Sequence, residues 1–166
     1  MRLPLIILVL VALQRLAELM LARRNEARLL ARGGVEHGRG HYRLFVILHG
    51  AWLLAILAQL DSEQAVNWLW LALFMLLQAG RAWVIASLGP FWTTRIITLD
   101  RAPLVRRGPY RWVRHPNYWV VAGEIIALPM AFGQIATAAV FTVLSGALTL
   151  WRIRTEDRVL APRRNR

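Results

Sequence analysis

The segment 135–151 contains no charged residue, and it is one of five long apolar stretches that run through the chain. As an α-helix, these 17 residues would extend about 25 Å, close to the hydrocarbon thickness of a bilayer. Hydrophobic residues make up 57% of the sequence, against roughly 45–50% in an ordinary soluble domain. The pattern predicts an all-α integral membrane protein, a single domain over residues 1–166 with about five transmembrane helices. We expect these helices at about 3–22, 44–60, 65–88, 118–132 and 135–158.

The chain is strongly basic, with 21 basic and 9 acidic residues and a formal net charge of +12. All of the basic residues are arginines. A basic chain can bind nucleic acid, but the long apolar stretches between the arginines argue against that partner and favour the lipid bilayer. The absence of cysteine excludes disulfides, thiolate metal sites and lipidated cysteines.

The arginines are sorted by segment, and this sorting predicts an orientation. They concentrate in segments 23–43, 95–114 and 152–166, whereas the segment 61–67 is acidic. Because basic loops stay in the cytoplasm, we expect the N-terminus outside, the C-terminus inside and five crossings, of which the short fourth one need not be complete. The localisation that follows is a bacterial cytoplasmic membrane, with a cytoplasmic loop over residues 89–117.

Four charged residues lie inside apolar stretches, where a charge normally faces the interior of the helix bundle. Arg15 and Glu18 are three residues apart, so they can pair on one helix face beside a water-filled cavity. Glu124 could line a substrate or cofactor cavity. Alternatively, it could be held by a buried partner such as Arg81, which could also reach the cytoplasmic surface.

The segment 89–117 differs from the rest because prolines interrupt it and it carries half a dozen arginines. A loop of this length in so small a protein is usually functional. The β-branched run 93–99 could be extended. The stretch Gly108 to Tyr118 combines a rigid turn with three aromatic rings, two arginines, a histidine and an asparagine. These residues suit a small cofactor with an aromatic base and a charged tail, or equally a belt at the membrane surface.

The neutral turn at Gly133–Gln134 joins the last two helices into a hairpin. Their cytoplasmic ends, near Tyr118 and Trp151, must therefore lie close together. This proximity places His115 and Tyr118 beside Arg152 and Glu156, which are four residues apart on one helix face. On its own, the Arg152–Glu156 pair could be no more than a solvated ion pair.

The motif Leu104-Val-x-x-Gly-Pro-Tyr-Arg-x-Val-Arg-His-Pro-Asn-Tyr118, followed by Arg152-Ile-Arg-x-Glu156-Asp157-x-x-Leu160, resembles the isoprenylcysteine carboxyl methyltransferase family in its bacterial branch. The likeness covers roughly residues 85–160. It implies a polytopic enzyme that uses S-adenosylmethionine and methylates an oxygen of a lipophilic substrate held in the membrane. The family usually has two consecutive glutamates where this chain has Glu156-Asp157.

The resemblance also implies roles for residues of the motif. Arg152 and Glu156 would lie at the methyl-transfer centre. The cofactor-binding residues would be Gly108, Pro109, Tyr110, Arg114, His115, Pro116, Asn117 and Tyr118. Such a centre mainly has to hold donor and acceptor at reacting distance. A carboxylate acceptor is already ionised and could be oriented by Arg152, whereas a phenol or enol would lose its proton to His115 or Glu156.

The acceptor implied is an isoprenoid or another long-chain lipid, and such bundles can be monomers. Two other functions stay open: an NADPH-dependent enzyme similar to sterol reductases, and a non-catalytic module whose arginines bind lipid or a partner. His41 and His49 could border the mouth of the site. His37 and His41 are four residues apart, but glycines separate them and no acidic ligand accompanies them, so we expect no metal.

Overall fold

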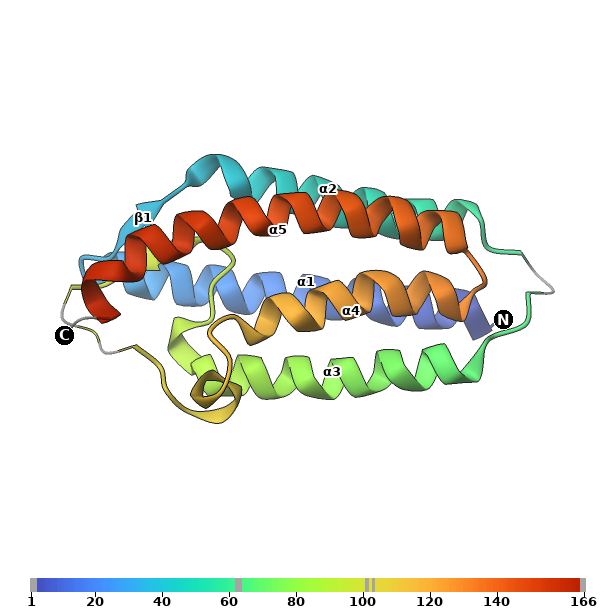
Figure 1. Ribbon diagram of the computed structural model, residues 1–166, viewed down its shortest axis with the longest axis horizontal. Helices are drawn as coiled ribbons and strands as arrows, with labels where there is room; N and C mark the ends of the chain where they lie inside the picture. Colours follow the sequence, from blue (N-terminus) through green and yellow to red (C-terminus); the bar gives the residue numbers. More distant parts are fainter. Residues whose placement is uncertain (1–2, 62–63, 101, 103, 165–166) are drawn as a thin grey trace.

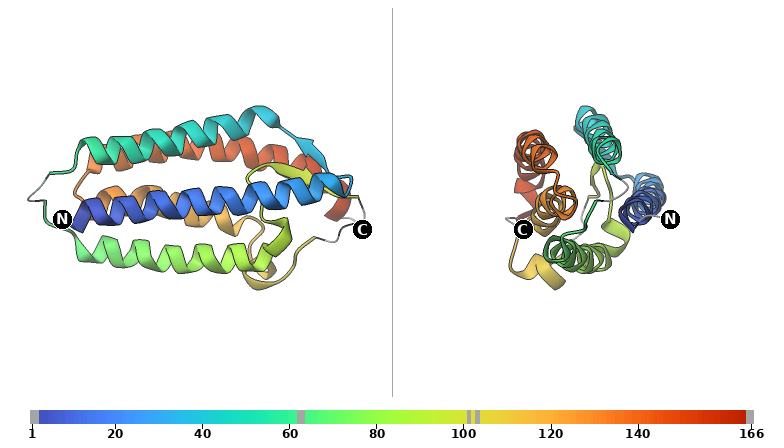
Figure 2. Two further views of the ribbon diagram at one scale, coloured as in Figure 1. Left: turned by 180° about the vertical axis from the view of Figure 1, so that it is seen from behind. Right: turned by 90° about the vertical axis from the view of Figure 1, so that its right-hand side faces the viewer.

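Five long helices run along the length of the molecule and form an elongated bundle (Figure 1). The computed structural model describes residues 3–61, 64–100, 102 and 104–164, with the backbone alone described at 39–41 and 162–164. The helices are α1 (Leu3–Ala31), α2 (Arg39–Ala58), α3 (Trp68–Leu88), α4 (Pro116–Ala131) and α5 (Ile135–Arg164). Seen along the bundle, α2 and α5 lie side by side, α1 and α4 lie on opposite sides, and α3 closes the bundle below (Figure 2).

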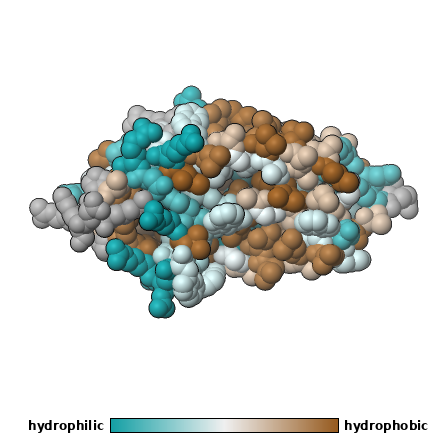
Figure 3. All heavy atoms as spheres, in the orientation of Figure 1, coloured by the Kyte–Doolittle hydropathy of each residue, from teal (hydrophilic) through white to brown (hydrophobic). Residues whose placement is uncertain are grey.

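The surface of the bundle has the character of a membrane protein. Within the described residues, three helices are long and apolar enough to cross a membrane, namely α1, α3 and α5, and α2 contains a shorter apolar helix. Apolar side chains cover the middle of the molecule, while hydrophilic ones gather at the end that holds β1 and the C-terminus (Figure 3). These features confirm an all-α membrane protein. The 16 residues of α4 extend only about 24 Å, and the number of crossings stays a prediction.

Several helices extend beyond the limits predicted from hydropathy. The first was expected to end at residue 22, but α1 continues to Ala31, and α5 continues past residue 158 to Arg164. The extension of α1 is rich in Arg, Ala and Leu, which favour helix in water as well. At the other boundaries, α2 begins at Arg39 and α3 at Trp68, where the Asn67 side chain caps the first turn by accepting from the N–H groups of residues 69 and 70.

The segment 89–117 contains short ordered elements. Two 3-10 helices, η1 (Gly89–Phe91) and η2 (Gly108–Arg111), flank the strand β2 (Ile96–Thr98). This strand confirms the extended conformation expected from the β-branched residues. It pairs antiparallel with β1 (Val35–His37), with Glu36 opposite Ile97, and β1 was not predicted. The small sheet therefore ties the end of α1 to the loop that precedes α4.

The α4–α5 hairpin has the predicted tight turn. Gly133 adopts a φ of 67°, a left-handed conformation that favours glycine. Gln134 is buried and donates from Nε2 to the carbonyl of Ile56, 3.1 Å away. This bond fixes the far end of the hairpin against α2. At the other end of the hairpin, α4 and α5 are joined by a hydrogen bond between Tyr118 and Arg152.

Candidate active site

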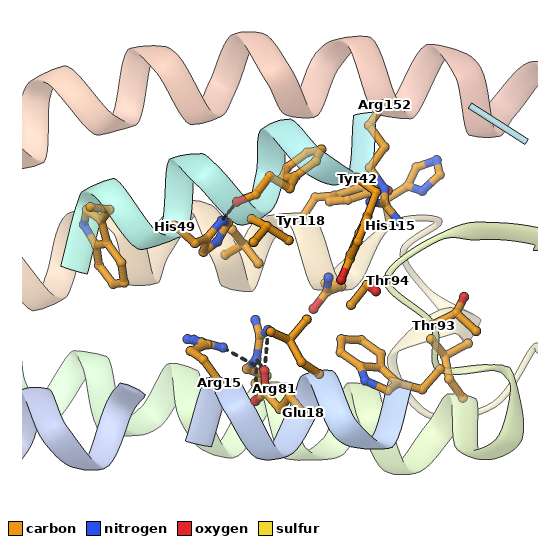
Figure 4. A pocket seen from close by; sticks show the side chains of 18 of the residues that line it. Arg15, Glu18, Tyr42, His49, Arg81, Thr93, Thr94, His115, Tyr118 and Arg152 are labelled. Carbon is orange, nitrogen blue, oxygen red and sulfur yellow. Dashed lines mark hydrogen bonds and ion pairs between the residues drawn. The ribbon is translucent and has the colours of Figure 1, made fainter. Parts of the chain in front are cut away.

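A cavity of about 450 Å³ lies inside the bundle, and Figure 4 shows side chains that line it. Every long helix contributes to its wall, and so do the loop residues Trp92, Thr93 and Thr94. The candidate residues Tyr110, Arg114, His115, Asn117, Tyr118, Arg152 and Glu156 line it, and so does His49. The cavity thus brings together both parts of the sequence motif.

The Tyr118 hydroxyl connects the two ends of the hairpin. It donates to Glu156 Oε2 at 2.6 Å and accepts from Arg152 Nε at 2.9 Å. Arg152 and Glu156 therefore meet on one hydroxyl group, as the hairpin geometry predicted. The Arg152 guanidinium also lies 5.2 Å from the centre of the Phe45 ring on α2, which encloses the group from the opposite side.

His115 precedes the first turn of α4, where Pro116 occupies the first helical position that proline favours. Its Nε2 is 3.1 Å from Asp157 Oδ1, and its Nδ1 is 3.8 Å from Glu156 Oε2. The shorter side chain of Asp157 therefore still reaches this group. The ring also packs against Tyr118, with 5.4 Å between centroids, so His115 is held by both helices of the hairpin.

The turn at Gly108 shapes the wall of the cavity without lining it. Gly108 has a φ of +57°, and a Cβ atom there would lie 2.0 Å from Ser87 Oγ, so only glycine fits against α3. Pro109 and Pro116, like Gly108, do not line the cavity, and they restrict the backbone conformation of the residues beside them. The turn carries Tyr110 into the cavity wall. Burial, together with the negative charge of Glu156, raises the pKa of Tyr110 above its usual range, so this phenol is neutral at physiological pH.

Asn117 offers a hydrogen-bond acceptor in the cavity wall. Its Oδ1 is buried and has no hydrogen-bond partner among the described residues. Buried polar atoms are normally paired. Asn117 is therefore suited to receive an N–H group of a bound molecule.

Farther from the C-terminal end, four largely buried charged side chains form a network. Arg15 contacts Glu18 at 3.0 Å and Glu124 at 2.9 Å, and Arg81 contacts the same two carboxylates at 2.7 and 3.2 Å. The predicted Arg15–Glu18 pair is therefore present, and both residues line the cavity. Glu124 is 2% exposed and does not belong to the lining. Its geometry matches the alternative in which Arg81 is its buried partner.

The second helix contributes His49 and Tyr42 to the lining. His49 Nδ1 lies 2.9 Å from the carbonyl oxygen of Phe45. His41 belongs to the first turn of α2, and its side chain is outside the described residues. Within the described ranges, no three His, Asp or Glu side chains are grouped as metal ligands would be.

The loop residues that line the cavity are held by α1. Glu26 Oε1 accepts from the Thr94 N–H at 3.1 Å, the Thr94 hydroxyl at 2.9 Å and the Arg95 N–H at 3.1 Å. The neighbouring Asn25 donates to the carbonyls of Gly89 and Trp92. Both side chains are buried. Sequence reasoning did not identify them, although a polar pair within the helical extension of α1 was the available signal.

Comparison with known proteins assigns the sequence to a family. The sequence model of the isoprenylcysteine carboxyl methyltransferase (ICMT) family matches residues 70–162, more than half of the chain. The chain belongs to the ICMT family. The uncharacterized protein YpbQ of Bacillus subtilis (strain 168) is 34% identical over 160 residues, which make up 93% of this chain and 95% of that protein. An uncharacterized protein of Haemophilus influenzae is 26% identical over 152 residues, 89% of this chain and 88% of its own length. No solved structure matches significantly.

The match to the ICMT family covers one side of the cavity. His115, Tyr118, Arg152 and Glu156 fall within residues 70–162, whereas α1 and α2 lie outside the match. Both bacterial relatives, however, align over most of the chain. The family model therefore does not cover the cavity wall that α1 and α2 form.

Proposed function

We propose that the protein is an S-adenosylmethionine-dependent O-methyltransferase of a lipophilic substrate embedded in the membrane. The observation that carries the proposal is the chain of contacts from Arg152 through the Tyr118 hydroxyl to Glu156, beside His115, in the wall of a cavity within the bundle. Membership of a methyltransferase family favours this activity over an NADPH-dependent reduction.

The described residues suit the cofactor in the part of the cavity nearest the motif. Asn117 Oδ1 is a free buried acceptor for an amino group, and the rings of Tyr110, His115 and Tyr118 offer flat surfaces for an aromatic base. The Glu156 carboxylate favours a positive charge nearby. When bound, S-adenosylmethionine would supply an electrophilic methyl group on a positively charged sulfur.

Arg152 would orient the acceptor oxygen. A guanidinium binds a carboxylate through two parallel hydrogen bonds, and Tyr118 already occupies Arg152 Nε, which fixes the direction of the group. A carboxylate acceptor needs no base, because it is ionised at neutral pH, and its product would be a methyl ester. For a phenol or enol, Glu156 or His115 would take the proton as the methyl ether forms.

The acceptor would enter sideways from the bilayer. Away from the motif, apolar side chains of α1 and α2 dominate the lining, among them Ala12, Leu16, Leu19, Val46 and Leu53. These side chains suit an isoprenoid or another long hydrocarbon chain. The cofactor would come from the cytoplasm if the arginine-rich end faces inward, with the N-terminus outside and the C-terminus in the cytoplasm of a bacterium.

The test is the melting temperature of the purified protein with S-adenosylhomocysteine or with NADPH. At one hundred times its dissociation constant, a ligand stabilises the folded state by about 2.7 kcal/mol, or roughly 5–10 °C for a chain of this size. We expect the melting temperature to rise with S-adenosylhomocysteine and not with NADPH. This rise should be smaller in Glu156→Gln. It should be retained in the control Asp61→Asn, which alters an acid at the opposite end of the bundle. A shift with NADPH alone, or none, would contradict the proposal.

The acceptor is tested separately by transfer of tritium from the labelled methyl group of the cofactor to membrane extracts. We expect label in the organic phase with the wild type and much less with Arg152→Ala. Label confined to water-soluble material would argue against a lipophilic acceptor.

A further inference from the structure

The cavity contains hydrogen-bond donors that the protein itself does not use. Among the described residues, buried side-chain nitrogens without a partner include Trp52 Nε1, Trp92 Nε1 and Arg15 Nε, and all three residues line the cavity. Trp52 is 1% exposed. Because buried donors are normally paired, these nitrogens indicate a bound group that accepts hydrogen bonds.

The donors of Arg15 and Trp52 lie deep in the cavity. The Arg152 guanidinium is 5.2 Å from the Phe45 ring, and His49 and Trp52 follow Phe45 on α2 by four and seven residues, or about 6 and 10 Å. On the other side of the bundle, Glu124 follows Tyr118 by six residues, about 9 Å, and it holds Arg15 at 2.9 Å. Both helices therefore place Arg15, His49 and Trp52 about 6–10 Å beyond the Arg152–Tyr118–Glu156 group.

The charge at this depth is already balanced. The two guanidiniums of Arg15 and Arg81 contact the two carboxylates of Glu18 and Glu124. An additional anion would bring an uncompensated charge into a buried site, which is costly. A neutral oxygen, in contrast, can accept from Trp52 Nε1 or from Arg15 Nε without disturbing the network.

His49 completes the polar surface. Its Nδ1 contacts the Phe45 carbonyl, which can only accept, so Nδ1 carries the proton and Nε2 of the neutral ring is an acceptor. The His49 and Trp52 rings are 6.4 Å apart in an edge-on arrangement. A ketone would use the donors alone, and a hydroxyl could also donate to His49.

We infer that Arg15, His49 and Trp52 form a second recognition site for the methyl acceptor, which we name the deep subsite. It would bind a neutral carbonyl or hydroxyl oxygen about 6–10 Å from the oxygen that is methylated. The inference rests on the proposed function. It narrows the substrate class to lipids that carry this second oxygen within the chain, and it disfavours acceptors whose buried part is pure hydrocarbon.

The experiment compares two isomeric acids that differ only in the position of the ketone. Unlabelled 8-oxohexadecanoic acid and 15-oxohexadecanoic acid compete with tritiated hexadecanoic acid for the full-length protein in nanodiscs. The 8-oxo group can reach the deep subsite while the carboxylate binds Arg152, whereas the 15-oxo group lies beyond it. We expect the 8-oxo acid to compete about 5- to 10-fold more strongly, the effect of roughly one added hydrogen bond.

Variants assign the preference to the deep subsite. Trp52→Phe keeps a ring but removes the N–H group, so the preference for the 8-oxo acid should fall to about 2-fold or less. The control Trp119→Phe changes a side chain that is 74% exposed and outside the lining, and it should retain the preference. Equal competition by the two isomers, or a preference that survives in Trp52→Phe, would overturn the inference.

The melting experiment with S-adenosylhomocysteine separates the two proposals. If the cofactor shift is present and the isomers compete equally, the deep subsite alone is refuted. If the isomer preference depends on Trp52 but the cofactor shift is absent, the subsite stands as a lipid-binding site and the methyltransferase function is refuted.

Discussion

Replacing Gly108 by alanine adds one methyl group at the turn that carries Tyr110 into the cavity wall. The new Cβ would lie 2.0 Å from Ser87 Oγ and 3.0 Å from Ser87 Cβ, and the residue has a φ of +57°. The left-handed backbone costs about 1–2 kcal/mol for a residue with a Cβ. Relieving the overlap with α3 costs about 1–3 kcal/mol more.

Gly33 provides a matched control for the backbone contribution. It has a φ of +84°, but no atom lies within 4 Å of the Cβ that alanine would add. We therefore expect Gly33→Ala to lower the stability by about 1–2 kcal/mol and Gly108→Ala by about 2–5 kcal/mol. At about 2–4 °C per kcal/mol, thermal melting of the purified protein distinguishes the two.

The double variant Gly108→Ala/Ser87→Ala tests the steric explanation directly. Removing Ser87 Oγ eliminates the closest contact, at 2.0 Å, so the double variant should be more stable than Gly108→Ala alone. Affinity for S-adenosylhomocysteine should recover with it, because the turn returns Tyr110 to the cavity wall. Equal melting temperatures for Gly33→Ala and Gly108→Ala, or no recovery in the double variant, would refute the reasoning.

Three further predictions concern the loop, the pH dependence and the orientation. Glu26→Ala leaves three donors of the loop without their acceptor, so local opening of the loop should become easier by about 2 kcal/mol. Trypsin should then cleave after Arg95 about 30-fold faster than in the wild type. Glu26→Gln keeps an acceptor oxygen, so its cleavage rate should change little. Because the pKa of Tyr110 is raised, its contribution to stability is complete below the ordinary pKa of about 10 and is lost above it, as the unfolded chain ionises. The fall in melting temperature between about pH 9 and about pH 11 should therefore be smaller in Tyr110→Phe, and an identical fall would contradict the shift. The chain has no cysteine, so single introduced cysteines report the orientation. In the proposed orientation, a membrane-impermeant maleimide should label Ala65→Cys in intact cells and Arg106→Cys only after permeabilisation. The reverse pattern would invert the proposed orientation.

The sequence predicted the part of the site that depends on local connectivity. A two-residue turn between the last two helices leaves one possible arrangement of their ends, and Tyr118, Arg152 and Glu156 accordingly meet. The charged residues in apolar stretches were equally informative, because the cost of an unpaired charge in the membrane demands the partners that Arg15 and Glu124 have.

Long-range contacts were not predictable in the same way. The strand β1 has three residues without a distinctive pattern, and its pairing with β2 depends on where α1 ends. Hydropathy marks only the membrane part of a helix. The predicted first helix therefore ended before Asn25 and Glu26. Trp52 has no signal in the sequence that distinguishes it from any other buried tryptophan, so the deep end of the cavity emerges only from the packed bundle.

The network of charges also has a consequence for how the helices enter the membrane one after another during synthesis. Arg15 and Glu18 leave the ribosome together, and their pairing within one helix gives a neutral segment to insert. Arg81 arrives with α3 and brings one excess positive charge into the unfinished bundle. Glu124 then cancels that charge from α4, which is short and carries an acid, and so has little tendency to enter the membrane alone. The ion pairs of Glu124 with Arg15 and Arg81 therefore favour the docking of α4 onto the bundle, and this docking also adds Tyr118 to the cavity wall.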